Sequence, residues 1–108
     1  MEYERPSKTY KFKIEDSDHA IYFTIVDGDS CVEAMFVNSK EMKSFQWVTA
    51  LMTSYSRQIK SGIPINNIIN DMKNTFDPIG VYYSGGKKYH SIIQQLGMIL
   101  EGHVNNEG

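Results

Sequence analysis

The residues best suited to chemistry gather in one short stretch, DPIGVYYSGGKKYHS, at residues 77–91. It combines three glycines, three tyrosines, two adjacent lysines and a histidine between two segments with helical spacing. Lysine ammonium groups and the backbone N–H groups of a glycine-rich turn or a helix start bind anions in proteins. One hypothesis for this stretch is therefore a site for an anion or a nucleotide. Its candidate residues are Gly85, Gly86, Lys87, Lys88, His90 and Ser91, with Arg57 added from a preceding helix.

The stretch does not satisfy the P-loop pattern, in which two glycines separated by four residues are followed by Lys and then Ser or Thr. Counted from Gly80, the lysine comes one position late, and Lys88 stands where the Mg²⁺-binding hydroxyl belongs. The favoured interpretation is a β-hairpin, because VYY and KYH are short β-like runs and Gly85-Gly86 can adopt the positive φ angles of a tight reversal. The anion site is kept as the alternative.

Other titratable groups give weaker signals. Two Asp-x-Asp pairs, at residues 16–18 and 27–29, lack the glycine and the twelfth-position glutamate of a calcium-binding loop and are interpreted as solvated turns. Cys31 lies in an apolar strand without an adjacent base, which favours a buried, inert thiol. The histidines His19, His90 and His103 fall in separate segments without metal-ligand spacing. We therefore expect no metal, no cofactor and no catalytic residues.

Length and composition indicate one small globular domain over residues 1–108, with 1–8 and 105–108 frayed. The formal net charge of −2 argues against wholesale binding to a nucleic-acid backbone. Residues 34–108 hold seven bases and five acids, which leaves room for a local anion site. One cysteine, no long apolar run and no signal-peptide core predict a soluble, cytoplasmic protein without membrane contact.

The first third of the chain has the period of strands. Residues 9–14 alternate strictly, residues 20–26 form a β-rich run, and residues 31–38 form a third. The Asp27-Gly28 dipeptide between the second and third runs is a hairpin signal. These features predict an antiparallel meander.

The period then becomes helical. Asn38 and Glu41 have the spacing of a capping box for a first helix, and Gly62 is placed to end it. Pro64 suits the first turn of a second helix, whose apolar stripe runs to Phe76 before Asp77-Pro78 stops it.

A third helix is predicted between a capping box of Ser91 and Gln94 and a C-terminal Gly102. The order β-β-β-α-α-loop-α predicts an α+β fold, a meander with three helices packed on one face and a Gly-rich hairpin before the last helix. The predicted core is Phe23, Ile25, Leu51, Ile68, Ile69, Met72, Ile92, Leu96 and Leu100.

The second strand carries apolar residues on both faces. Tyr22, Thr24 and Val26 lie on the side away from the helices, and the third strand adds either Met35 and Val37 or Phe36, depending on register. A sheet with helices on one face normally presents a polar second face to water. We therefore predict a homodimer through this face, with coverage by the N-terminal segment as the alternative.

Three segments carry a family resemblance: FVNSK, SGIPINNIINDM and DPIGVYYSGGKKYHSIIQQLGMILEGH. With the order of elements, the chain from about Ala20 to Val104 resembles the TSCPD domain. That module is found at the C-terminus of adenosylcobalamin-dependent (class II) ribonucleotide reductases and in small free-standing proteins, including phage-type ones. Many members carry cysteines in the loop before the last helix. This chain has none there, so the metal or thiol role that they suggest does not carry over.

The resemblance implies an accessory module, since the radical chemistry of the reductases lies elsewhere in their chains. The first functional hypothesis is a non-catalytic module that binds a protein, such as a nucleotide-metabolism enzyme, or a nucleotide-like ligand. The second is a stand-alone binder, for example a phage-encoded regulator or inhibitor, that captures a phosphorylated nucleotide at Lys87 and Lys88. An enzyme is the least supported, because no positioned acid, base or nucleophile stands out.

Overall fold

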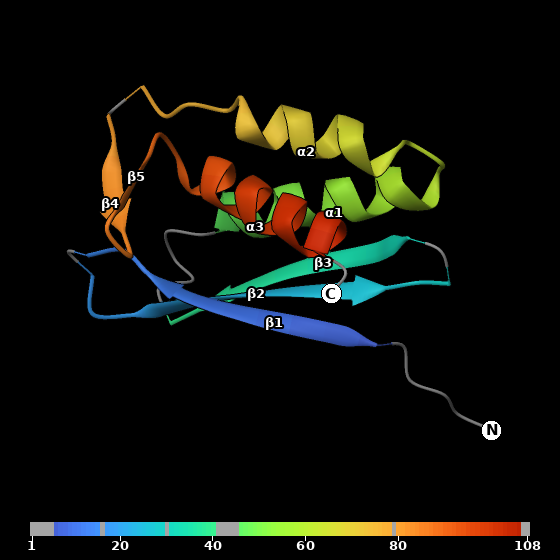
Figure 1. Cartoon of the computed structure of the whole chain (residues 1–108), viewed down its shortest axis with the longest axis horizontal. Helices are drawn as coiled ribbons and strands as arrows, with labels where there is room; N and C mark the ends of the chain where they lie inside the picture. The colour runs from blue at the N-terminus through green and yellow to red at the C-terminus, as the bar shows by residue number, and fades with distance from the viewer. Residues whose placement is uncertain (1–5, 16, 30, 41–45, 79, 107–108) are drawn as a thin grey trace.

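The fold is α+β, as predicted: a three-stranded antiparallel sheet lies under a layer of three helices (Figure 1). The structure is a computed structural model that describes residues 6–106 except 16, 30, 41–45 and 79. Its elements are β1 (Ser7–Lys13), β2 (Ala20–Asp27), β3 (Val32–Ser39), α1 (Gln46–Lys60), α2 (Ile65–Lys73), β4 (Tyr82–Ser84), β5 (Lys87–Tyr89) and α3 (Ile92–Asn106).

The sheet order is β1-β2-β3, which confirms the meander. Phe23 at the centre of β2 pairs with Tyr10 on one side and with Val37 on the other. The alternation of each strand therefore aligns its inward residues with those of its neighbour. The register shifts at Val26 and Asp27, next to the turn into β3.

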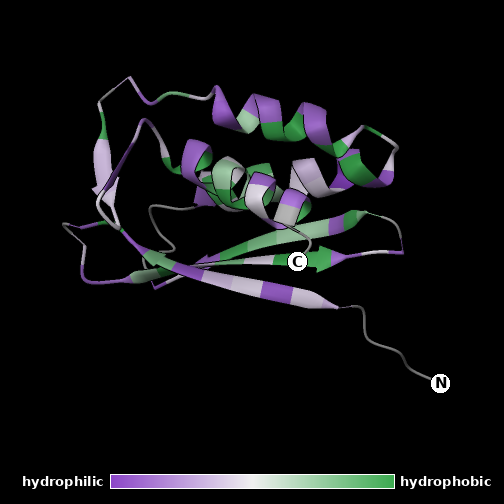
Figure 2. Cartoon of the chain, viewed as in Figure 1, coloured by the Kyte–Doolittle hydropathy of each residue, from purple (hydrophilic) through white to green (hydrophobic). Residues whose placement is uncertain are grey.

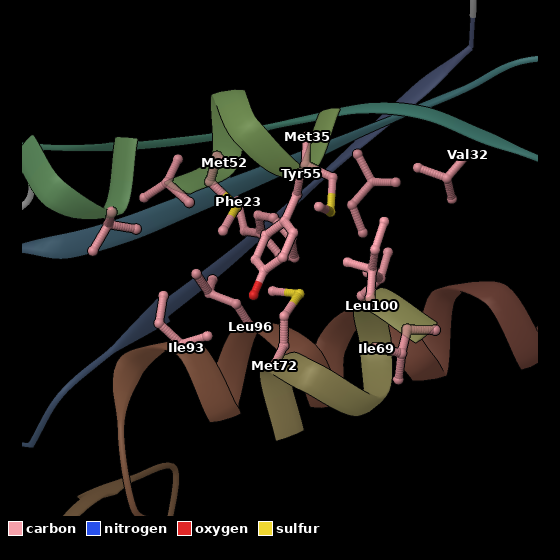
Figure 3. Packing of buried hydrophobic residues seen from close by; sticks show 14 of the residues in the cluster. Phe23, Val32, Met35, Met52, Tyr55, Ile69, Met72, Ile93, Leu96 and Leu100 are labelled. Carbon is pink, nitrogen blue, oxygen red and sulfur yellow. The ribbon is translucent and has the colours of Figure 1, made fainter. Parts of the chain in front are cut away.

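The inward face of β2 forms the floor of the core. Phe23 and Ile25 are fully shielded from solvent. Helix α1 packs on β3, while α2 packs on α3, so the core lies between the sheet with α1 and the other two helices (Figure 3). In Figure 2 the apolar residues of α2 face the other helices and its polar residues face outward. The largest side chains buried with Phe23 and Ile25 are Met35, Met52, Ile68, Met72, Ile93, Leu96, Leu100 and Val48.

Two predicted core residues lie at the edge of this core. Leu51 and Ile92 are only partly buried, although both pack against the buried cluster. The inward line of α1 runs through Val48, Met52 and Tyr55 at spacing i, i+4, i+7, and Leu51 flanks it.

The start of the first helix differs from the prediction. Asn38 does not cap a helix, because it lies in β3 and pairs with Tyr22. Glu41, the other half of that predicted capping box, lies outside the described residues. The predicted end is confirmed: Gly62 has a φ of 99°, its N–H donates to Ile59, and the next N–H donates to Gln58. This is the Schellman pattern.

The second and third helices end elsewhere than predicted. Helix α2 stops at Lys73, and Phe76, the last residue of the predicted stripe, is exposed. The amide side chain of Asn74 donates to the carbonyl oxygen of Asn70 and satisfies part of the helix end. Helix α3 continues through Gly102 to Asn106, so the predicted glycine cap is wrong. Leu100, Ile99 and Val104 extend its apolar contacts across that position, which favours continued helix.

A glycine permits the close packing of α2 on α3. A Cβ atom added to Gly97 would lie 2.7 Å from the Met72 Cβ and 3.1 Å from the Lys73 backbone nitrogen. Neither atom is the free end of a flexible side chain. The two helices are also joined by an ion pair of 2.9 Å between Lys73 and Glu101.

We predict opposite effects for two glycine-to-alanine changes in α3. Gly97→Ala should lower the free energy of unfolding by about 1–3 kcal/mol, the usual cost of overpacking. Gly102→Ala meets no atom within 4 Å, so it should raise stability by about 0.5–1 kcal/mol through helix propensity. Urea unfolding followed by circular dichroism measures both, and equal effects of the two changes would contradict the α2–α3 packing.

Candidate functional site

The glycine-rich stretch contains a short antiparallel pair. Strand β4 pairs with β5 through Tyr82–Tyr89 and Ser84–Lys87, and the turn residues Gly85 and Gly86 have φ angles of 58° and 80°. Successive strand residues point to opposite faces. The side chains of Lys87 and Lys88, both exposed, therefore leave β5 on opposite sides. The pair does not converge on one point.

The remaining groups of the predicted anion site have partners inside the fold. The His90 ring stacks on Phe76 with ring centres 4.6 Å apart. Ser91 is buried and caps α3: its hydroxyl accepts the Gln94 N–H at 2.9 Å and donates to the carbonyl oxygen of Thr75. Gln94 Oε1 in turn accepts the backbone N–H of His90 at 2.8 Å, one residue before the cap of the predicted capping box.

Arg57 lies far from these residues. It occupies the last turn of α1, which adjoins the start of α2 at the end of the molecule opposite to β4 and β5 (Figure 1). The structure therefore brings together Gly85, Gly86 and the two lysines in one hairpin, and it places Arg57 elsewhere.

A buried polar network fastens the hairpin to the rest of the fold. Tyr82 donates to Gln95 Oε1 at 2.6 Å, and Gln95 Nε2 donates to Ser84 at 3.0 Å. The Ser84 hydroxyl in turn donates to the backbone carbonyl oxygen of Lys13 at 2.7 Å. Gln95 and Ser84 are both buried. Sequence reasoning missed this network, although two consecutive glutamines within an apolar helix face were a visible signal.

The sheet surface opposite the helices is open and has mixed chemistry. We call it the outer sheet face. Tyr22 and Phe36 are 40% and 56% exposed there. The register resolves the predicted alternatives, because Phe36 points outward while Met35 and Val37 are buried on the inner side. The exposed or half-buried residues of this face are Ser7, Thr9, Lys11, Lys13, Ala20, Tyr22, Thr24, Val26, Phe36 and Asn38.

Charge on the outer sheet face has one sign. Lys11 and Lys13 lie on it, and none of its residues is a carboxylate, although the whole chain has a net charge of −2. The Lys11 Nζ lies 6.0 Å from the centre of the Tyr22 ring, within the range of a cation–π contact. The hydroxyl oxygens of Thr9 and Thr24 are 2.8 Å apart. The face thus combines aromatic rings, hydroxyls and positive charge.

A hydrogen-bonded chain of three side chains closes the other side of the sheet. The Tyr10 hydroxyl lies 2.8 Å from His103 Nδ1, and His103 Nε2 lies 2.9 Å from Asp27 Oδ1. It joins β1 and β2 to α3, and His103 is 93 positions from Tyr10 and 76 positions from Asp27 along the chain. No sequence spacing could have pointed to it. The three side chains contact one another, and we call this hydrogen-bonded series, which holds α3 on the sheet, the Asp27–His103–Tyr10 clasp.

Cys31 is exposed, in contrast to the predicted buried thiol. It precedes the first residue of β3 and lines an open depression of about 240 Å³. The depression lies between the β2–β3 turn and the end of α1, and its lining is Gly28, Asp29, Cys31, Val32, Glu33, Ile59 and Lys60. Within the described part of the chain, no three His, Cys, Asp or Glu side chains come together as metal ligands would.

The comparison with protein families decides the relationship of the chain. A family model described as the TSCPD domain matches residues 1–104. The chain belongs to the TSCPD domain family. The match covers nearly all of the 108 residues and confirms the resemblance seen in the sequence. No curated protein and no solved structure matched this TSCPD domain at the threshold applied. Among its described residues, no helix has the length and apolar content to cross a membrane.

The network around Tyr82 predicts sensitivity to alkali. Burial, reinforced by the neighbouring Tyr89, raises the pKa of the Tyr82 phenol above its ordinary value of 10.0. The unfolded chain releases this proton first. The contribution to stability is therefore complete below pH 10 and is lost as the pH rises above it, by about 1.4 kcal/mol per pH unit.

Urea unfolding between pH 8 and pH 11 measures this effect. Tyr82→Phe should flatten the alkaline slope, because the titrating group is gone, and should cost about 1 kcal/mol at pH 7 through the lost hydrogen bond to Gln95. Tyr83→Phe, a change on the exposed side of the same strand, is the matched control. If both variants keep the slope of the parent protein, the Tyr82 assignment is wrong.

Proposed function

We propose that this TSCPD domain is a non-catalytic binding module that takes a nucleotide-like ligand on its outer sheet face. The observation that carries the proposal is the exposure of Tyr22 and Phe36 beside Lys11 and Lys13 on a face whose described residues include no carboxylate. A nucleobase stacks on an aromatic ring with little dependence on its identity. A phosphate group is attracted by lysine ammonium groups.

The strand order arranges these two functions side by side. Lys11 is the cross-strand partner of Tyr22, and Tyr22 is the partner of Asn38 on the next strand. A ligand lying across the sheet can place its base over β2 and β3 and its phosphate over β1. The helices cover the opposite side of the sheet and leave this approach open (Figure 1).

The hairpin lysines complement this site. Ser84, the cross-strand partner of Lys87, donates to the backbone carbonyl of Lys13 at 2.7 Å. Lys87 therefore lies beside the end of β1 that carries Lys13. This position supports a shared role for the hairpin in holding phosphate, rather than a self-contained phosphate pocket, since Ser91 and His90 have other partners.

We propose a non-catalytic role because the titratable side chains that could act together are already hydrogen-bonded to one another. The Asp27–His103–Tyr10 chain is the arrangement most similar to an acid–base relay, and its atoms are paired within the fold. An accessory role fits the resemblance to the reductase C-terminal domain, because reductases act on nucleotides. A module that presents a nucleotide to a reductase, or that captures one as a stand-alone regulator, matches both the non-catalytic role and the resemblance.

Calorimetric titration with deoxyadenosine monophosphate tests the proposal, with ribose 5-phosphate as the ligand that lacks a base. The nucleotide should bind more tightly, because only it can stack. Phe36→Leu, which keeps an apolar side chain but removes the ring, should weaken nucleotide binding by about 1–3 kcal/mol. Trp47→Leu is the matched control, because Trp47 is an exposed aromatic residue on α1.

Two results would contradict this site. Equal affinity for the nucleotide and for ribose 5-phosphate would remove the role of the aromatic rings. Loss of binding in Lys87→Ala/Lys88→Ala, together with full binding in Phe36→Leu, would move the site from the sheet to the hairpin.

A second copy of the chain is the alternative occupant of the outer sheet face. Val26 is half-buried on it, and Phe36 now joins Tyr22 as an outward apolar ring. Two such surfaces related by a two-fold axis would form a self-complementary interface. A dimer in light scattering at micromolar concentration that is split by Tyr22→Glu or Val26→Glu, with circular dichroism unchanged, would establish it. A monomer would reject it and leave the face free for a ligand.

A further inference from the structure

We infer that the nucleotide-like ligand of the outer sheet face is a single-stranded nucleic acid, two successive bases of which stack on Tyr22 and Phe36. The inference rests on the proposed function and specifies its ligand. It concerns the chemistry of this one face, whose charge is opposite in sign to the net charge of the chain.

The two rings are placed for two bases rather than one. Tyr22 pairs with Asn38, whereas Phe36 pairs with Thr24, so the two aromatic residues are diagonal neighbours on adjacent strands. Diagonal neighbours in an antiparallel pair are roughly 7–8 Å apart, within reach of aromatic side chains but too far for one base to cover both rings fully. Both rings are open to solvent on the same side. Aromatic residues on neighbouring strands of an open sheet are a known platform for splayed single-stranded bases.

The lysines are placed for a backbone that follows β1. Lys11 and Lys13 are two residues apart on the same face of the strand, a separation of roughly 6–7 Å. Lys11 lies beside the aromatic pair, since it is the partner of Tyr22, and Lys13 lies two residues further along β1, opposite Ala20. A strand of nucleic acid that runs along β1 would therefore direct its bases over β2 and β3 and its phosphates toward the lysines.

The hairpin extends this basic path beyond the sheet. Its turn is fixed to the chain after β1, where the Gly86 N–H donates to Glu15 Oε2 at 3.2 Å. The carboxylate of Glu15 therefore lies at the turn, and Lys87 and Lys88 follow the turn on β5. A mononucleotide has a single phosphate group for the lysines of the sheet and the hairpin to share, but a longer strand has a phosphate for each.

The shape of the face selects single strands. A sheet surface presents stacking rings only to bases that are already exposed, and duplex bases are stacked on each other. The hydroxyls of Thr9 and Thr24 and the amide of Asn38 add hydrogen-bonding groups without a fixed pattern for one base. Binding is therefore expected to depend weakly on sequence.

Fluorescence anisotropy with labelled oligothymidylates tests the inference. We expect an eight-nucleotide strand to bind at least about tenfold more tightly than thymidine monophosphate, whose affinity is measured by competition. The matching duplex should bind only through the attraction of its phosphates to the lysines. Tyr22→Leu and Phe36→Leu should each weaken the oligonucleotide complex by at least about fivefold, while Phe36→Trp retains binding. Lys11→Gln and Lys13→Gln should each lower the slope of log K against log salt by about 0.7.

Trp47→Leu and Lys60→Gln are the matched controls, since both residues lie on α1 and outside the outer sheet face. Circular dichroism melts of every variant separate loss of binding from loss of fold. A mononucleotide that binds as tightly as the oligonucleotide would overturn the inference and leave the proposed function standing. Absence of binding to either would overturn both. Oligonucleotide binding that is unchanged in Tyr22→Leu and Phe36→Leu would place the strand elsewhere and overturn the inference alone.

Discussion

Burial of one face of β2 is the constraint on which the rest of the structure depends. Phe23 and Ile25 are fully shielded because they lie in one buried cluster with side chains from β3 and the helices, and removing such side chains from water is the main stabilising contribution in a domain of this size. The described residues form three helices, and all of them lie on the same side of the sheet (Figure 1). The outer sheet face is therefore exposed as a consequence of how the core is completed, and the aromatic residues on it are available to a ligand or partner.

Polar groups at the start of α3 determine what the glycine-rich stretch can do. Ser91 and Gln94 satisfy backbone groups at the end of α2 and at the start of α3, and Gln95 joins the hairpin to β1 through Ser84. A buried polar group without a partner destabilises a fold, so these contacts are constrained. A stretch with the composition of an anion-binding loop is for the most part a structural junction. Of its candidate anion-binding side chains, Lys87 and Lys88 are exposed, His90 is half-buried and Ser91 is buried.

Membership of the TSCPD domain family and the geometry of the sheet support one interpretation. The proposed role as a nucleotide-binding module draws on the aromatic rings beside lysines on the outer sheet face. The Asp27–His103–Tyr10 clasp keeps α3 on the inner side of the sheet. It thereby preserves the division of the molecule into a packed side and the outer sheet face.

The period of apolar residues by itself determined the meander, the three helices, the α+β class and most of the core, because alternation and 3.6-residue spacing reflect which side of each element is buried. It also placed Gly62 correctly as a helix end. Helix ends such as Lys73 and Asn106 depend on contacts between α2 and α3, which no local pattern contains. Only the tertiary structure decided that Phe36 faces outward beside Tyr22 and that His103 meets Asp27. These facts depend on strand register and on residues brought together across the fold, and a linear sequence does not specify the partner of a side chain.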